Sequence, residues 1–386
     1  MKKEILLKGI TTNIIILGLV SLFTDLSSQM VFPLIPLYLI SVLNAGAYIV
    51  GIVEGAADST ASLLKVVSGY WSDKIKKRKP FVLIGYSVST ITKPLFALAN
   101  SWSLILFVRV VERVGKGLRD APRDAIVAES VDKRFVGKAY GFQRAMDSLG
   151  AVLGGVLAFL LLPIYGYKNL FLFAFIPGVI AVFAILLVKE KKKIHEKIEK
   201  ITIKVSFKKL PKNLKLFILA ATIFALGHFG YAFLLLKAKD SGFADNISIL
   251  LYILFYVTCT LITIPAGILS DKLGRRPLLI IGYVLFIFTC FGLIFFTGWW
   301  ILVFFIIYGI FFAIMDCVQR AYVVDLAPQN LKGTALGTFH TAIGLVALPG
   351  GYIAGLLWDK ISPEATFVYA MILSLIGLLL FVLVKE

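Results

Sequence analysis

The sequence is poor in the residues that build disulfide frameworks and metal centres. Its 386 residues include only three cysteines and three histidines. Cys259, Cys290 and Cys317 lie inside apolar stretches and none belongs to a CxxC pair, so neither a disulfide framework nor a thiolate metal site is expected. We expect no metal and no cofactor, and interpret the cysteines as small packing residues.

Motifs of catalysis and of nucleotide binding are also missing. The sequence contains no HExxH pattern and no nucleophile–base constellation, so we do not expect an enzyme. The GKGLRD stretch at residues 115–120 lacks the GxxxxGK[ST] spacing of a phosphate-binding loop. ATP-driven pumping by this chain alone is therefore not expected.

Acidic residues are fewer than basic ones. The chain has 22 Asp and Glu and 40 Lys and Arg, which give a formal net charge of +18. A soluble nucleic-acid-binding protein is not expected, since 59% of the residues are hydrophobic and the mean hydropathy is +0.91. Apolar stretches of about 20 residues, long enough to cross ~30 Å of hydrocarbon as a helix, recur along the chain. Segments such as LILFVRVV lack the alternating polarity of membrane β-strands. The fold class expected is an all-α integral membrane protein.

Twelve spans are expected, at residues 13–40, 47–71, 81–99, 102–128, 138–162, 168–188, 214–236, 246–270, 277–297, 299–325, 334–357 and 364–384. The first is not interpreted as a signal peptide, because its apolar run is too long and no small-residue cleavage site follows. Alternating loops place 27 Lys and Arg on the side of the N-terminus and 4 on the other. This bias predicts a multi-pass cell-membrane protein with both termini in the cytoplasm. The basic loops would also attract anionic lipid headgroups.

The spans divide into two matching halves. Residues 1–188 and 214–386 are expected to form two six-helix bundles, joined by a basic cytoplasmic linker at 189–213. A constant offset of 196 residues pairs Ala125 with Ala321, Glu129 with Asp325, Gly137 with Gly333, Gly141 with Gly337, and Gly154-Gly155 with Gly350-Gly351. Parallel repeats of this kind are a known transporter architecture.

Three motifs make the chain resemble the major facilitator superfamily along its whole length. GILSDKLGRRP, at residues 267–277, is similar to the cytoplasmic loop signature of that family, and GYWSDKIKKRKP, at 69–80, is a first-half copy without the second Gly. Arg109, Gly115 and Gly117 resemble the family's RxxQGxG, with Glu112 and Arg113 in place of Gln-Gly. Residues 150–155 resemble the exporters' GPxxGG, with Ala where that motif has Pro.

The resemblance implies twelve helices in two pseudo-symmetric bundles, with the first, fourth, seventh and tenth spans lining a central cavity. It also implies that the loop acids Asp73 and Asp271 contact the opposite half, where an acid can accept backbone N–H groups at a helix start. A cytoplasmic gate is expected, in which Arg275 and Arg276 pair with Asp325, residues 76–79 pair with Glu129, and Asp124 takes part. The alternative is that these charges only set the topology.

The fourth span carries a stripe of charge. On a helical wheel of 100° per residue, its eight charged residues fall within 140°: Arg109, Glu112, Arg113, Lys116, Arg119, Asp120, Arg123 and Asp124. A charge at mid-bilayer costs roughly 2.5–3.5 kcal/mol, whereas an apolar residue contributes only ~0.5. The stripe must therefore face other helices or water. The resemblance places its deep members, Arg109, Glu112 and Arg113, beside a solute path.

Other polar residues within the spans complete the candidate cavity: Asp25 and Gln29 in the first span, Lys93 in the third, and His228 and Tyr231 in the seventh. Pro33 and Pro36 should bend the first span. Asp25 is the candidate coupling acid, which would change protonation as access alternates. The alternative is a permanent salt bridge to Arg109, Arg113 or Lys93. His228 is interpreted first as a packing residue and second as a titrating one.

Glycines on the fifth and eleventh spans allow close helix approach. We expect Gly150, Gly154, Gly155, Gly350 and Gly351 to form a sliding seam between the halves.

The function expected is alternating-access secondary transport of a small organic solute by a monomer, coupled to protons and directed outward. Uptake or exchange of an organic anion is the alternative, since Arg109, Arg113 and Lys93 outnumber the nearby acids. A non-transporting sensor or a lipid scramblase on the same scaffold is the alternative from another class.

Overall fold

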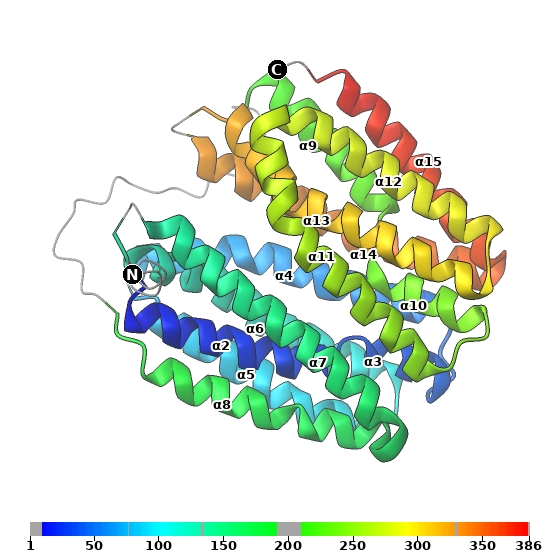
Figure 1. The fold of residues 1–386 in the computed structure, drawn as a ribbon, viewed down its shortest axis with the longest axis horizontal. Coiled ribbons are helices and arrows are strands. Elements are labelled where there is room, and N and C mark those ends of the chain that lie inside the picture. The colour runs from blue at the N-terminus through cyan, green and yellow to red at the C-terminus, as the bar shows by residue number, and fades with distance from the viewer. Residues whose placement is uncertain (1–9, 76, 133–134, 191–209, 329–330, 385–386) are drawn as a thin grey trace, which may run out of the picture. The chain divides into compact units, whose positions relative to one another are not determined.

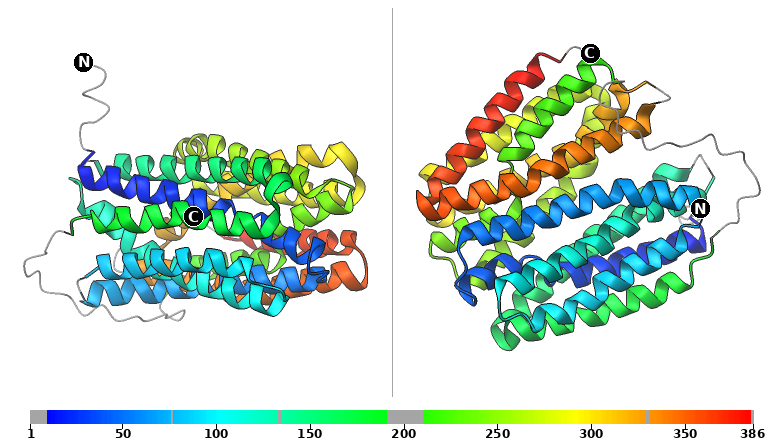
Figure 2. Two further views of the ribbon diagram at one scale, coloured as in Figure 1. Left: turned by 90° about the horizontal axis from the view of Figure 1, so that it is seen from below. Right: turned by 180° about the vertical axis from the view of Figure 1, so that it is seen from behind.

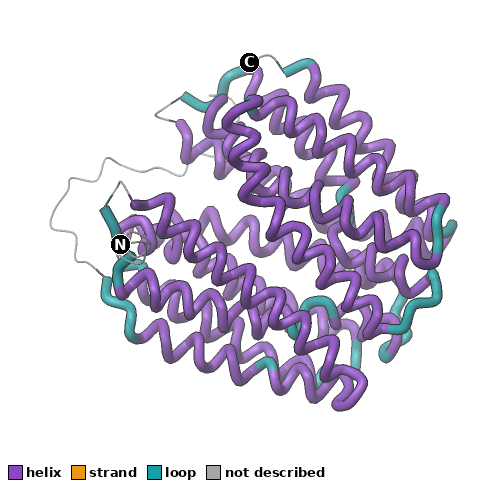
Figure 3. The backbone as a smooth tube through the Cα atoms, viewed as in Figure 1, coloured by secondary structure: helices purple, strands orange, loops and turns teal. Residues whose placement is uncertain are grey.

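The computed structural model describes residues 10–75, 77–132, 135–190, 210–328 and 331–384, and every regular element in them is a helix (Figure 3). The earlier helices are α2 (Thr12–Gln29), α3 (Leu34–Ser41), α4 (Ala47–Ile75), α5 (Lys79–Ala97), α6 (Trp102–Glu129), α7 (Val136–Phe173) and α8 (Phe175–Leu186). The later ones are α9 (Lys212–Gly227), α10 (Gly230–Asp240), α11 (Asp245–Leu273), α12 (Arg275–Phe295), the short 3₁₀ helix η3 (Gly298–Trp300), α13 (Ile301–Leu326), α14 (Lys332–Lys360) and α15 (Pro363–Val382).

These helices account for the twelve expected spans. By length and hydropathy alone, eight stretches of the described residues could cross a membrane. The more polar helices α4, α5 and α6 are not among the eight, but they coincide with the second, third and fourth expected spans. One of the eight, Val136–Leu186, holds two spans, because Gly166 with φ of 70° turns the chain inside α7 (Figure 1). The fold is thus that of an all-α integral membrane protein.

The helices pack into two units. The first contains Met1–Phe32 and Leu63–Thr202, and the second contains Pro33–Ser62 and Ile203–Glu386. The division into 1–188, 189–213 and 214–386 follows the repeat in the sequence and stays a prediction. The packing units differ from it because residues 33–62 join the helices of the second half. Most of the expected linker, 191–209, lies outside the described residues.

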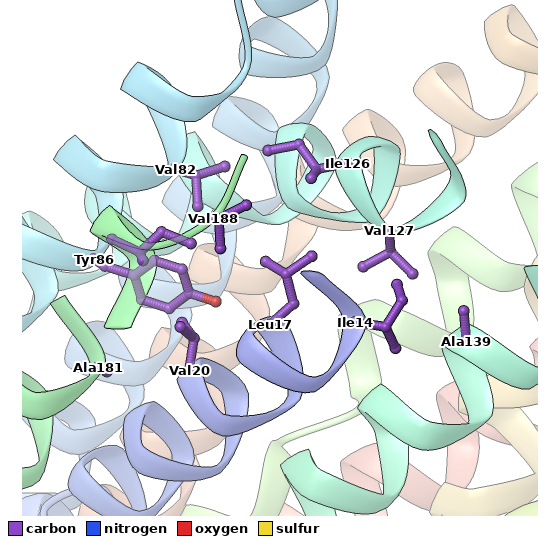
Figure 4. Packing of buried hydrophobic residues seen from close by; sticks show 11 residues of the cluster. Ile14, Leu17, Val20, Val82, Tyr86, Ile126, Val127, Ala139, Ala181 and Val188 are labelled. Atoms are coloured by element: carbon purple, nitrogen blue, oxygen red, sulfur yellow. The ribbon is translucent and has the colours of Figure 1, made fainter. Parts of the chain in front are cut away.

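In the first unit, α2 lies against α7 and α8, and α5 lies against α6 and α8. One end of this bundle is closed by a hydrophobic cluster contributed by five helices and by Val188, two residues after the end of α8 (Figure 4). Its members are Ile14, Leu17, Val20, Val82, Tyr86, Ile126, Val127, Ala139, Ala181, Ile185 and Val188. This packing fixes the register of α2 against α5 and α6, and so fixes which polar side chains meet further along.

In the second unit, α13 packs on α11 and α12, and α9 packs on α14 and α15. Helix α3 contacts α10, and the first part of α4 runs along α14 (Figure 2). These two contacts explain why residues 33–62 group with the second unit.

The first and seventh spans are both broken. The turn at 30–33 separates α2 from α3, as Pro33 and Pro36 predict, and His228 and Phe229 separate α9 from α10. The second break has no proline; its Gly230 adopts φ of +64°, a conformation that suits glycine. Pro33 and Phe229 differ by 196, the offset of the sequence repeat. The repeat therefore extends to the place where each helix is interrupted.

Candidate functional site

The charged stripe of α6 is turned toward protein. Arg109 and Glu112 are 0% exposed, Arg119 4% and Arg113 6%. The other four charged residues, Lys116, Asp120, Arg123 and Asp124, are half-buried. The four deepest charges are thus shielded from hydrocarbon, as the cost of a charge there requires, and the other four keep part of their surface accessible.

The deep charges of the first unit gather around one aromatic ring. Lys93 Nζ, Arg109 Cζ and Arg113 Cζ lie 4.6, 4.0 and 4.9 Å from the centroid of Phe32. Glu112 Oε2 lies 3.3 Å from Arg109 Nη1 and 3.7 Å from Arg113 Nε. We call Phe32, Lys93, Arg109, Glu112 and Arg113 the ring cluster. It combines ion pairing with cation–π contact in a region without exposed polar surface.

Two further contacts hold the ring cluster in place. Lys93 Nζ donates to Ser28 Oγ at 3.2 Å, which ties α5 to α2. A Cβ at Gly115 would lie 2.6 Å from Ser89 Oγ and 2.7 Å from the Gly85 carbonyl oxygen, so only glycine lets α6 approach α5 so closely. Gly117 contacts another helix, α4, because its carbonyl accepts a 2.7 Å hydrogen bond from Ser68 Oγ. Gly115 thus permits the close approach of α6 to α5, and the backbone carbonyl of Gly117 links α6 to α4.

A second group of charges lies further along the same helices. Asp25 of α2 is half-buried, and interacts electrostatically with Lys116, Arg119 and Arg123 of α6 and with Asp147 of α7. We call these five residues the acid-pair cluster. The expected alternative partners of Asp25 were Arg109, Arg113 and Lys93. In the structure, Arg109 and Arg113 pair with Glu112 instead. Asp25 interacts electrostatically with cations that lie one to four turns nearer the end of α6.

Arg119 also connects this cluster to α5. Its Nη1 donates to Ser89 Oγ at 2.5 Å, and its guanidinium lies 4.6 Å from the Tyr86 ring centroid. Gln29, one turn beyond Asp25, is 7% exposed and packs where Gly154 of α7 approaches α2. Its side chain therefore lies at a helix–helix contact.

In the second unit, His228 lies in an aromatic cluster at the break between α9 and α10. Its Nε2 is 3.0 Å from the Tyr308 hydroxyl, and its ring is stacked on that of Tyr308 at 6.1 Å and 2°. The rings of Phe224, Phe286 and Phe311 lie within 5.8 Å of His228. Tyr231 packs against Tyr252 instead, with ring centroids 5.0 Å apart. This geometry agrees with the packing interpretation of His228.

The loop before α12 brings together part of the expected gate. Arg275 Nη1 lies 2.5 Å from Asp271 Oδ1, and Arg275 Nε lies 3.2 Å from Asp325 Oδ2. Asp271 was expected to accept backbone N–H groups of the opposite half; here it pairs with the arginine one turn on. Arg276 was expected to bind Asp325, but its Nη2 donates to the Val382 carbonyl at 2.7 Å. Consecutive helical residues point 100° apart, so only one of the two arginines reaches Asp325.

The matching loop of the first unit holds an ion pair in the corresponding place. Arg78 Nη1 lies 2.5 Å from Glu129 Oε1. Asp124 pairs with Arg123 at 3.0 Å, and its carbonyl accepts the Tyr140 hydroxyl at 2.7 Å. The side chain of Asp73 lies outside the described part of the chain.

The packing glycines act largely within single units. A Cβ at Gly150 or Gly154 would overlap the carbonyl oxygen of Leu22 or Leu26 in α2. A Cβ at Gly350 would lie 2.5 Å from the Leu226 carbonyl oxygen of α9. The expectation that all of these glycines form a seam between sequence halves is wrong at these three positions, because each faces the first helix of its own half. Gly155 is also buried.

Gly351 differs from these glycines. It meets the backbone of Gly51, so here the second half of the sequence contacts the first inside the second unit.

Sequence reasoning missed three participants. Phe32 carried no sign of its role, since an aromatic residue in a span is usually a packing residue. Asp147 was overlooked among the glycines of the fifth span, although an acid within a span is by itself a signal. Lys237 is one of the four basic residues expected on the side opposite the N-terminus, and it is 1% exposed and binds Glu364 at 3.0 Å and Asp240 at 3.4 Å.

Comparison with known families gives one match that covers the chain. The model of the Major Facilitator Superfamily matches residues 17–248 and 217–386. An uncharacterized MFS-type transporter of Methanocaldococcus jannaschii is 42% identical over 383 residues, which cover 97% of this chain and 95% of that protein. The multidrug resistance protein MdtH of Blochmanniella pennsylvanica is 30% identical over 148 residues, 38% of this chain and 36% of its own length.

Solved structures agree at the level of the fold. A variant of the nucleoside transporter NupG superposes with a TM-score of 0.82 at 15% identity, covering 97% of this chain and all of its own. A bacterial homologue of the human lysosomal transporter Spinster, in an inward-facing and occupied conformation, gives 0.76 at 13% identity, with 96% of each chain covered.

Proposed function

Because the chain belongs to the major facilitator superfamily of transporters, we propose that it is a proton-coupled secondary carrier that exports a small organic solute by alternating access. The observation that carries this proposal is the acid-pair cluster. Two carboxylates, Asp25 and Asp147, lie there within electrostatic reach of each other and of three cations. Ionisable groups in the membrane interior are costly, so those that are present usually have a function.

The cluster offers a place for one exchangeable proton. Repulsion between two carboxylates is relieved when one of them binds a proton, whereas Lys116, Arg119 and Arg123 stabilise the form in which both are ionised. A small change in water access can therefore change the charge of the cluster by one. Helix α8, which also packs on α2, has no charged residue in Phe175–Leu186 that would oppose this change.

Export is supported by the relatives named multidrug resistance proteins, although they match only 38% of the chain. Uptake or exchange of an organic anion is a second candidate, favoured by the three cations around Phe32. We rank it lower because no charged residue of the ring cluster is more than 6% exposed. A solute could reach these groups only after the cluster had opened. We therefore assign the ring cluster a structural role, in which its contacts hold neighbouring helices together.

We also propose where the carrier lies in the cell and that it acts as a monomer. A monomer would lie in the cell membrane with both termini in the cytoplasm, as the 27 to 4 bias of basic residues favours. Its cytoplasmic loops would carry the ion pairs Arg78–Glu129 and Arg275–Asp325, which would part as the inner gate opens. Anionic lipid headgroups would contact the basic loops.

The test begins with purified protein and three probes of different charge: tetraphenylphosphonium, citrate and uridine. Thermal stabilisation by one of them selects the probe for proteoliposomes that contain a pH-sensitive dye. We expect an imposed pH gradient to drive its flux, and Asp25→Asn to abolish this driving effect while counterflow exchange continues. Asp316→Asn, which removes an acid from another spanning helix, is the control and should keep the gradient response.

Three results would contradict the proposal. A gradient response that persists unchanged in Asp25→Asn would remove Asp25 as the coupling acid. Stabilisation by citrate alone, with flux that ignores the pH gradient, would favour anion exchange. Absence of flux for every stabilising probe would favour a sensor or a scramblase.

A further inference from the structure

The part of α4 that belongs to the second unit carries two acidic residues in the middle of a span. Glu54 and Asp58 are one helical turn apart, so they project from the same face of α4 with about 6 Å between their Cβ atoms. Glu54 is buried, whereas Asp58 is exposed. Asp58 lies about 16 Å along the helix axis from Ala47, the first residue of α4. A carboxylate at this depth is costly in hydrocarbon, so its exposed surface must face water or a bound group.

Three tyrosines of α10 and α11 surround Glu54. The ring centroids of Tyr231 and Tyr256 are each 5.0 Å from that of Tyr252. Tyr252 interacts electrostatically with Glu54 and with the two other tyrosines. Tyr252 is almost fully buried, but Tyr231 and Tyr256 are only half-buried. We call Glu54, Asp58, Tyr231, Tyr252 and Tyr256 the tyrosine site.

Asp58 belongs to the same site through the break between α9 and α10. It interacts electrostatically with His228 and with Tyr308, whose side chains are 3.0 Å apart at Nε2 and the hydroxyl oxygen. Tyr231 interacts with both Tyr308 and Tyr252. The surroundings of the two carboxylates are therefore continuous, and tyrosines from α10, α11 and α13 provide them.

The spans of the second unit have an excess of negative charge. Outside the first and last turns of its described helices, the charged residues are Glu54, Asp58, Asp316 and Arg320. Asp316 and Arg320 lie 2.6 Å apart and neutralise each other. Glu54 and Asp58 thus set the sign of the charge in this part of the unit. The ring cluster of the first unit has the opposite sign, since it contains three cations and one acid.

Carboxylates and tyrosine rings together favour an organic cation. The face of an aromatic ring attracts an ammonium group, and a phenol oxygen can accept its hydrogen bonds. A guest with one positive charge would neutralise only one of the two carboxylates, and a charge that is not neutralised is costly in a region of low dielectric. A guest with two protonated nitrogens neutralises both. A short hydrocarbon chain between the nitrogens would pack against the rings.

We propose that the tyrosine site binds a doubly protonated aliphatic diamine, with one nitrogen at Glu54, the other at Asp58, and the chain between them against the tyrosine rings. The inference rests on the proposed transport function and deepens it by naming the class of the solute. It assigns the second unit the selection of the solute, whereas the acid-pair cluster of the first unit takes the proton.

The test measures binding to the purified full-length protein in nanodiscs by isothermal titration calorimetry. The probes are 1,4-diaminobutane, whose nitrogens match the spacing of Glu54 and Asp58, and butylamine, which has the same chain and one nitrogen. We expect the diamine to bind about tenfold more tightly, since it makes one more charge-assisted contact. Equal affinities for the two probes, or no binding of the diamine, would overturn the proposal.

Asp58→Asn should abolish the preference for the diamine, because asparagine keeps the shape of the side chain without its charge. The two probes should then bind within about twofold of each other. Asp316→Asn removes an acid elsewhere in the same unit and is the control, so its preference should equal that of the wild type. An unchanged preference in Asp58→Asn, in protein that elutes as a folded monomer, would remove Asp58 from the site and overturn the proposal.

Tyr256 tests the contribution of the aromatic rings. Tyr256→Leu should weaken diamine binding about fivefold, as the loss of a half-exposed cation–π contact implies. Tyr256→Phe keeps the ring and is the matched control, so it should bind the diamine like the wild type. Equal affinities of the leucine and phenylalanine variants would contradict the role given to the ring.

The tyrosine site and the proposed function can fail separately. Selective binding of the diamine together with no pH-driven flux would keep the site and remove the proton-coupled carrier. A pH-driven flux of another solute, in protein that does not bind the diamine, would keep the carrier and remove the site.

Discussion

The guanidinium carbon of Arg109 lies 4.0 Å from the centroid of the Phe32 ring, and both side chains are almost fully buried. Lys93 and Arg113 approach the same ring, so one phenyl group meets three cations. The ring replaces part of the water that these cations would have in solution. The ring cluster should therefore depend on the aromatic face of Phe32 and not only on its volume.

Replacing Phe32 by leucine should destabilise the protein by about 1–2 kcal/mol, the value of a desolvated cation–π contact. Leucine keeps most of the apolar volume but has no π face. Phe32→Tyr is the matched control, since it retains the ring. Unfolding in mixed micelles of rising SDS fraction measures the change, and equal stability of Phe32→Leu and the wild type would contradict the prediction.

Glu112 is the carboxylate of the ring cluster, and Glu112→Gln should cost about 3–5 kcal/mol because it leaves buried cations without its charge. Asp316→Asn removes the acid of another pair, Asp316–Arg320 at 2.6 Å, whose side chains are 31% and 41% exposed. Solvent screens that pair, so its loss should cost only ~0.5 kcal/mol. The same SDS titration compares both variants. A similar loss in the two would mean that burial does not set the strength of the Glu112 pairs.

Arg275 bridges two acids at the surface, and its coupling to Asp325 should be weak. Its side chain is 26% exposed and that of Asp325 is 55% exposed, so we discount the ion pair for screening and expect roughly 0.2–1 kcal/mol. A double-mutant cycle of Arg275→Gln and Asp325→Asn measures this coupling. It should shrink when the salt concentration rises from 0.05 to about 0.5 M. A coupling that does not change with salt would indicate a buried pair.

The inward orientation of the α6 stripe could be predicted from the sequence, because the cost of charge in hydrocarbon leaves a helix few alternatives. The partners of Asp25 could not be predicted from the sequence. They depend on how α2 is aligned with α6, and that alignment follows from the core residues at the ends of both helices. Asp25 lies seven residues before Phe32, and Lys116 lies seven residues after Arg109. Since the two helices run in opposite directions, the same alignment that places Phe32 against Arg109 brings Asp25 within electrostatic reach of Lys116, seven residues further along each segment.

The helix that each packing glycine contacts also could not be predicted from the sequence. The repeat correctly pairs Gly154 with Gly350, because the same packing problem recurs in each half. The sequence does not say which helix each glycine faces, and three glycines assigned to a seam between halves face α2 or α9 instead. Nor could the break at His228 be predicted from proline. Gly227 and Gly230 replace it there, and glycines are too common in spans to identify a break.

The repeat makes a final prediction about pairs of glycines. Gly154→Ala and Gly350→Ala should each destabilise the protein by about 1–3 kcal/mol, since a new Cβ would collide with the Leu26 or the Leu226 carbonyl oxygen. Both collisions are with helix backbone, which cannot move aside as a flexible side chain can. The two variants should therefore lose similar amounts of stability.

Gly137→Ala and Gly333→Ala are the matched controls, because the same offset of 196 relates them and a Cβ at either would meet nothing within 4 Å. Alanine favours a helix over glycine, so these variants should be neutral or more stable by up to about 1 kcal/mol. SDS titration of the four proteins measures all the changes. If Gly350→Ala were neutral while Gly154→Ala was destabilising, the two units would not solve this packing problem in the same way, and the structural equivalence of the repeats would fail at the helix that begins each half.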